Sequence, residues 1–462
     1  MDNFWDFNTW GIILLFGVLL GSLLVGSLLK KGIPLLKKSL IPTSVLGGTV
    51  LIIIAAVYKS VTGDVMFDTA AFGGNGTATL ETITYHTLAL GFIASALKSS
   101  GEKLNKKRSN EIFNTGVTTV ATYLLQGIFG LGITIIATLL LDDFFSAAGV
   151  LLPFGYGQGT GQAMNYGNIY ETEFGFIGGK SFGLTIAAFG FLSAAFGGVV
   201  HLNIRKKRGK LTVNGERPIL KGEAIEGENE IPMQESIDKM TVQIALIFVA
   251  YMIAYLIMLG LGNLLPGMKA TVYGFNFLLG VLAATLVKTI MAFMKKLRIT
   301  TRDYTNNFLL TRVSNFFFDI MIVAGVAAIR LDYLEQYWGI LLILAVVGLF
   351  VTYIYNRIVA KTLFGEYVEE QFLAMYGMLT GTASTGIILL REIDGEFKTP
   401  AADNLVYQNF PAIVFGFPMM LLATLAPKKP ILTLIIFVIF FLVLNIILFR
   451  SFIFRRRKNK EK

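Results

Sequence analysis

The sequence has no cysteine, two histidines and few charged residues. Without cysteine there is no disulfide, thiol nucleophile or cysteine-bound metal. The two histidines, His86 and His201, have no partner at metal-ligand spacing, so we expect no metal site. Only 15% of the 462 residues are charged and 54% are hydrophobic, whereas soluble domains carry about a quarter charged residues. In water such a chain would expose enough apolar surface to aggregate, which argues against a soluble enzyme.

Long apolar segments take up most of the chain. Each is about 20 residues long, enough to cross roughly 30 Å of hydrocarbon as a helix. The sequence therefore predicts an all-α polytopic membrane protein with about 11 transmembrane helices. The predicted spans are residues 10–29, 42–58, 83–98, 112–141, 180–204, 238–262, 270–294, 308–330, 337–360, 404–426 and 431–454.

Basic residues follow the first, third, fifth, seventh and last predicted spans. Lys and Arg accumulate in cytoplasmic loops, so this pattern predicts a cell-membrane protein with its N-terminus outside and its C-terminus in the cytoplasm. The formal charge of +10 is explained by this topology, and we expect membrane lipid rather than nucleic acid as a partner.

One long polar segment, residues 205–237, divides the chain and is predicted to be a cytoplasmic linker. Five predicted spans precede it. Because five is odd, the second half starts on the opposite side of the membrane, which predicts two inverted repeats at 1–204 and 238–426. Residues 427–462 would add a final helix and a basic cytoplasmic tail.

Each half contains an apolar segment that is too short to span, near 145–172 and 368–392. In the first, Ala147–Gly155 is followed by a glycine-rich stretch in which a continuous helix is costly. In the second, Gln371–Thr380 leads into Gly381–Gly386. The pairs Gly159-Thr160 and Gly381-Thr382 lie 222 positions apart. Interrupted segments at matching positions of two halves indicate a transporter site, so we predict two re-entrant hairpins.

Half-helices that end within a membrane expose N–H groups or carbonyls, which suit a carboxylate and Na⁺ respectively. The predicted substrate-binding residues are Gln158, Gly159, Thr160, Gly161, Gln162, Asn165, Gly381, Thr382, Ser384, Thr385 and Arg391. The predicted ion-coupling residues are Asp319, Asn315 and Thr380, because a carboxylate within a span usually faces a cavity or a partner. The alternatives are glycines that serve packing, an Arg391 that reports topology, and an Asp319 paired with Arg312.

Three segments resemble the bacterial sodium/glutamate symporter family. They are Lys37–Gly48, Gly157–Ala163 and Ser314–Asp319. The resemblance implies two re-entrant hairpins, a homodimer built through a scaffold domain, and elevator-like movement of a transport domain. It also implies Na⁺-driven uptake of glutamate.

The leading hypothesis is therefore a secondary transporter, not an enzyme, that imports L-glutamate or a related anionic amino acid with Na⁺ as the coupling ion. The alternatives are a Na⁺/H⁺ antiporter that uses Asp319, a Na⁺-coupled transporter of another small carboxylate, a channel, and a membrane-embedded transferase. A transferase is disfavoured because the carboxylate pair Asp142-Asp143 has no histidine or metal-ligand neighbour in the sequence.

Overall fold

The computed structural model describes residues 4–98, 105–141, 143–208, 230–233, 237–395 and 398–450. Most of the predicted linker, Asp142 and the basic tail after residue 450 lie outside the described residues. Within those ranges the chain is helical, and its only extended pairing is an isolated bridge between Glu230 and Asp303.

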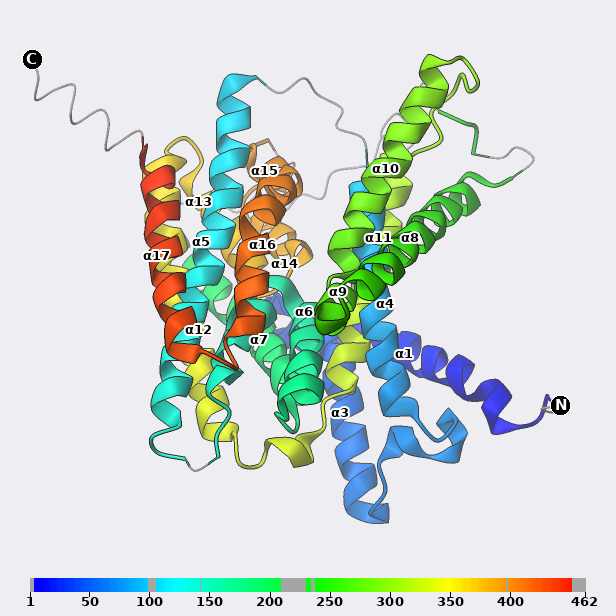
Figure 1. Ribbon diagram of the computed structural model, residues 1–462, viewed down its shortest axis with the longest axis vertical. Coiled ribbons are helices and arrows are strands. Elements are labelled where there is room, and N and C mark those ends of the chain that lie inside the picture. The colour runs from blue at the N-terminus through cyan, green and yellow to red at the C-terminus, as the bar shows by residue number, and fades with distance from the viewer. Residues whose placement is uncertain are drawn as a thin grey trace, which may run out of the picture. The chain divides into compact units, whose positions relative to one another are not determined.

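Figure 1 shows the helices in chain order. They are α1 (Phe7–Gly32), α2 (Pro34–Lys38), α3 (Thr43–Thr62), α4 (Gly76–Ala96), α5 (Lys106–Ala137), α6 (Leu151–Phe174), α7 (Gly179–Lys207), α8 (Lys239–Leu264), α9 (Lys269–Gly274), α10 (Asn276–Lys296), α11 (Asn307–Ala327), α12 (Trp338–Leu363), α13 (Val368–Thr380), α14 (Ala383–Arg391), α15 (Ala401–Tyr407), α16 (Asn409–Leu425) and α17 (Pro430–Leu448). Short 3₁₀ turns join several of them, including η3 (Ser146–Val150), which leads into α6.

All eleven predicted spans fall on helices. In the described part of the chain, nine helices are long and apolar enough to cross a membrane, or ten if the bent pair α15 and α16 forms one span. This confirms the character of a polytopic membrane protein. Helix α4 is not among the nine. Its first half carries Thr77, Glu81, Tyr85 and His86, so the predicted span at 83–98 covers the more apolar end of a longer helix and includes two of these polar residues.

Apolar side chains remain exposed along several of these helices, as expected for helices in contact with lipid. Helix α17 has no charged residue, and Ile431, Ile435, Ile439 and Ile446 are each more than half exposed. Such a continuous apolar surface does not persist in water.

The chain divides into two units. Unit 1 comprises Met1–Ser22, Ile53–Lys103 and Pro218–Ala328. Within it α4 packs against α8, α10 and α11 around a core that includes Ile93, Ile247 and Leu310. The Ser314 hydroxyl donates to the Gly91 carbonyl at 2.9 Å and joins α11 to α4. Buried Gln243 on α8 donates to the Tyr304 carbonyl and accepts from the Asn306 N–H, so it fastens α8 to the segment that leads into α11.

Unit 2 comprises Leu23–Ile52, Leu104–Arg217 and Ile329–Lys462. Its most extensive helix pairings are α6 with α7, α13 with α14, and α17 with α5. In Figure 1 the red α17 runs beside the cyan α5. Both segments that the sequence predicts to be broken, α6 and α13–α14, belong to this unit.

Candidate functional site: two broken helices that meet on α7

The first broken segment, residues 146–174, turns back on itself at Gly159. This residue has φ 80° and ψ −170°, a combination that is essentially restricted to glycine. The Phe154 and Tyr166 rings stack with their centroids 3.8 Å apart. Twelve residues of uninterrupted helix would separate the two by about 18 Å. The chain therefore doubles back between them.

The break is narrower than predicted. The sequence suggests that the four glycines from Gly155 to Gly161 interrupt the helix, yet Gly159 alone has non-helical dihedrals within α6. Gly155 and Gly157 serve close packing instead: a Cβ on Gly155 would lie 2.8 Å from the Ala187 backbone nitrogen, and one on Gly157 would lie 2.1 Å from the Tyr123 ring. Tertiary contacts thus compensate for the low helix propensity of glycine.

The second broken segment, residues 368–391, is interrupted between α13 and α14. Gly381 has φ −151° and ψ −102°, and Thr382 caps α14 by accepting a hydrogen bond from the Thr385 N–H. A Cβ on Gly386 would lie 2.3 Å from the Ala374 carbonyl oxygen. Residues twelve positions apart are thus in contact, so this segment also doubles back.

The two broken segments share a sequence pattern at a register that differs from the predicted one. Tyr-Gly-x-x-Thr-Gly-x-Ala occurs at residues 156–163 and again at 376–383, 220 positions apart. The predicted offset of 222 positions aligns only Gly159-Thr160 with Gly381-Thr382. The five shared positions are the signal that could have found the correspondence from sequence.

Both segments converge on α7. The Tyr156 hydroxyl lies 2.8 Å from Ser193 Oγ, and the Tyr376 hydroxyl donates to the Ser193 carbonyl at 2.9 Å. One turn earlier, a Cβ on Gly190 would lie 2.5 Å from the Thr380 carbonyl oxygen and 3.3 Å from Tyr156 Cα. Ser193 and Gly190 therefore bring the equivalent tyrosines and the two breaks to one place. Neither residue belongs to the site predicted from the sequence.

The first break is lined by buried polar groups. Thr160, Gln162 and Asn165 are at most 4% exposed, Gly161 is buried, and Gln158 is half-buried. Gln162 Oε1 accepts a hydrogen bond from Asn165 Nδ2 at 2.9 Å. Gln162 Nε2 is buried with no hydrogen-bond partner among the described residues. A buried donor of this kind costs free energy until an acceptor arrives.

The second break is polar but less enclosed. Gly381, Thr380 and Thr385 are buried, whereas Thr382 and Ser384 are half-buried. The Thr380 hydroxyl donates to the Tyr376 carbonyl at 2.7 Å, so its remaining capacity is as an acceptor. The N-terminal turn of α14 presents N–H groups to the break.

Arg391 lies at the opposite end of α14 from this break. It is the last residue of the helix and is exposed. The nine residues from Ala383 to Arg391 place the two ends of the helix about 12 Å apart. On this element, therefore, the guanidinium and the broken backbone are at opposite ends.

Asp319 and Asn315 belong to unit 1, whereas all the other predicted site residues belong to unit 2. Both lie on α11 and both are exposed within the described chain. Arg312, the predicted alternative partner of Asp319, lies over the Phe308 ring with its Cζ 5.0 Å from the centroid.

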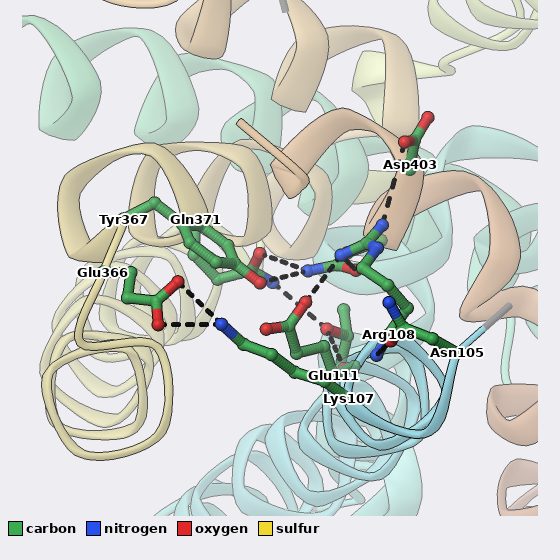
Figure 2. Close-up of polar contacts among 10 residues, drawn as sticks. Asn105, Lys107, Arg108, Glu111, Glu366, Tyr367, Gln371 and Asp403 are labelled. Carbon is green, nitrogen blue, oxygen red and sulfur yellow. Dashed lines mark hydrogen bonds and ion pairs between the residues drawn. The ribbon is translucent and has the colours of Figure 1, made fainter. Parts of the chain in front are cut away.

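A polar network fixes the start of the second broken segment (Figure 2). Arg108 on α5 bonds Glu111 at 2.6 Å and Asn404 Oδ1 on α15 at 3.1 Å. Asn404 Nδ2 in turn donates to the Tyr367 hydroxyl at 3.0 Å and to Gln371 Oε1 at 2.9 Å. Three elements are thus joined at the first turn of α13.

On another side of that turn, Glu369 forms ion pairs with two arginines. Arg357 on α12 bonds Glu369 at 2.6 and 2.9 Å, and Arg205 on α7 also pairs with it. His201 Nε2 lies 2.8 Å from the same carboxylate, and its Nδ1 lies 2.7 Å from the Tyr353 hydroxyl. His201 is therefore a buried structural group that fastens α13 to α7. No group of three or more potential metal ligands occurs among the described His, Asp and Glu residues.

No protein-family model matches this chain, and no curated protein matches it significantly. The geometry and the sequence therefore carry the functional assignment.

Proposed function

We propose that this protein is a secondary active transporter that moves a small carboxylate across the cell membrane by symport with Na⁺. One observation supports it most: two broken helices that carry the same sequence pattern meet on α7, within a unit made of membrane-type helices. Backbone that leaves the helix at membrane depth is tolerated where it lines a cavity or is buried in protein. Paired breaks of this kind are typical of transporter binding sites.

The two breaks would be the tips of re-entrant hairpins related by an inverted repeat. The repeats are residues 1–204 and 238–426, with α17 as an addition. The repeated pattern at 156–163 and 376–383 supports this relationship. The positive-inside distribution supports an outside N-terminus and a cytoplasmic C-terminus.

The substrate carboxylate would bind at the first break. The buried Gln162 Nε2 is an unused donor there, and the arm that begins at Thr160 presents the positive end of its helix dipole. The capped start of α14 supplies a second set of N–H groups. We assign the remaining predicted substrate-binding residues at the two breaks, among them Ser384, to substrate contacts that form as the site closes. Asp319, Asn315 and Thr380 remain the proposed ion-coupling residues.

Na⁺ would drive uptake by linkage. If the ion and the carboxylate each stabilise the same closed arrangement of the hairpins, each raises the affinity for the other by the same factor. The inward Na⁺ gradient then favours uptake. The resemblance to the sodium/glutamate symporter family makes L-glutamate the first substrate to test. It also suggests a homodimer in which one unit serves as scaffold.

The test is uptake of labelled L-glutamate into liposomes that contain the purified protein. We expect accumulation with an inward Na⁺ gradient and none with K⁺ in place of Na⁺. Unlabelled aspartate and citrate added in excess would define the carboxylate class. Gly260→Ala on α8 is a control for the effect of mutation itself, since nothing lies within 4 Å of a Cβ at that position. Uptake that is indifferent to Na⁺ would refute symport.

A further inference from the structure

Helices α5 and α12 share a second repeated motif at their mid-length. Thr122 and Gln126 on α5 are spaced one helical turn apart, as are Thr352 and Asn356 on α12. Gln126 Nε2 donates to Thr352 Oγ1 at 2.8 Å, and Asn356 Nδ2 donates to Thr122 Oγ1 at 3.3 Å. Each amide therefore reaches the threonine of the other helix. The segments read Thr-Tyr-Leu-Leu-Gln and Thr-Tyr-Ile-Tyr-Asn, 230 positions apart.

Backbone carbonyls determine which way the two amides face. Gln126 Nε2 also donates to the Leu379 carbonyl at 2.9 Å, and Asn356 Nδ2 donates to the Thr352 carbonyl at 2.9 Å. A carbonyl only accepts, so the amide nitrogens point to it and the amide oxygens point away. Gln126 is 0% and Asn356 is 1% exposed. Neither amide oxygen receives a hydrogen bond from the described residues.

The four side chains form a neutral cluster that offers acceptors. The Thr122 hydroxyl donates to the Thr118 carbonyl, and both amide nitrogens are engaged. Helix α12 has no acidic residue, and the single acidic residue of α5, Glu111, lies about 16 Å before Thr122 along the helix axis. Arg357, the neighbour of Asn356, pairs with Glu369, which it shares with Arg205.

We propose that Gln126 Oε1 and Asn356 Oδ1 are ligands of a small monovalent cation, Na⁺, bound between α5 and α12. Hard cations prefer amide and carbonyl oxygens, and a site without carboxylates suits a single charge rather than a divalent ion. The role of the ion rests on the proposed function and makes it more specific. Leu379 directly precedes Thr380 at the second break, so an ion held here stabilises the position of that break.

Na⁺ binding is measured on the full-length protein in detergent, without any transport. Thermal unfolding is followed as NaCl replaces choline chloride at constant ionic strength, and ²²Na⁺ binding is measured in parallel. We expect Na⁺ to raise the unfolding temperature in a saturable way and K⁺ to raise it less. A protein that shows no Na⁺-dependent shift and no ²²Na⁺ binding overturns the proposal.

Three variants separate ligand loss from structural damage. Gln126→Met and Asn356→Leu remove one amide oxygen each and should lower the apparent Na⁺ affinity at least ten-fold. The control is Gln243→Met, which removes a buried amide in unit 1 whose oxygen and nitrogen are both bonded. It should lower the unfolding temperature and keep the Na⁺-dependent shift. An equal shift in all three variants would mean that the two oxygens bind water and would overturn the proposal.

The near-isosteric changes Gln126→Glu and Asn356→Asp cover the case in which the first two variants do not fold. Measured at pH 8, each should raise the Na⁺ affinity at least three-fold, and unchanged affinity in both overturns the site. Liposome uptake then separates this proposal from the proposed function. If the variants keep both glutamate uptake and the Na⁺-dependent rise in unfolding temperature, the Na⁺ site is refuted and the proposed transport function is not. If the variants lose Na⁺ binding but the unmodified protein transports no carboxylate, the proposed transport function is refuted and the Na⁺ site is not.

Discussion

The two broken segments solve the same structural problem in different ways. The first turns within a single residue, Gly159, and both of its arms are buried. The second ends one helix at Thr380 and starts another at Ala383 with a threonine cap. Its polar residues Thr382 and Ser384 are half-buried. The first break is thus enclosed in packed helices, whereas the second is more open and is held by polar contacts at its start.

The largest expected effect is a stability difference between the two glycines. In Gly159→Ala the new alanine must adopt a φ of 80°. This strain should lower the free energy of unfolding by about 1–3 kcal/mol or displace the turn. In Gly381→Ala the backbone has negative φ and the Cβ would meet the Thr385 hydroxyl at 2.9 Å, so the cost should be smaller. Thermal unfolding in detergent measures both, and equal losses would contradict the distinction between the breaks.

A second stability difference concerns the ion pairs that hold the second segment. Glu369→Gln leaves Arg205 and Arg357 without their carboxylate partner and should lower stability by about 1–2 kcal/mol, since the group is partly solvated. Glu366→Gln is the matched control, because its partner Lys107 is exposed, and it should leave the unfolding temperature unchanged. A similar response to both would show that the Glu369 contacts do not anchor α13.

Substrate affinity should depend strongly on the enclosed break. Gln162→Met removes a buried donor while keeping the side-chain length. Hydrogen bonds to a charged group contribute about 1.5–3 kcal/mol, so the apparent KM for glutamate should rise about ten-fold or more. Initial uptake rates over a range of glutamate concentrations give this value. An unaltered KM would remove Gln162 from the substrate site.

The smallest expected effect is at the open break. Ser384→Ala removes a half-buried hydroxyl that competes with water, so we expect the apparent KM to rise about two- to three-fold at a hydrogen-bond contribution of about 0.5 kcal/mol. The same uptake assay checks it. A larger effect than that of Gln162→Met would reverse the order of the two breaks.

Much of the architecture could be predicted because burial in a membrane leaves a strong, local signal. Where the chain is described, each of the eleven predicted spans overlaps a long helix, although those at 270–294 and 404–426 each cover two helices. Both predicted interruptions occur, at Gly159 and at Gly381. The exact extent of the first interruption could not be predicted. Whether Gly155 and Gly157 remain helical depends on their contacts with Ala187 and Tyr123, which are distant in sequence.

Composition and periodicity alone determined that this is a helical membrane protein whose chain breaks in two places, since hydrocarbon length and glycine's backbone freedom act residue by residue. Only the tertiary structure decided that both broken segments meet at Gly190 and Ser193. It also decided that Gln126 and Asn356 each bond the threonine of the other helix and keep an unused oxygen. The reason is physical. Such pairings depend on which helix faces lie against each other, and single-helix patterns contain no information about the partner face.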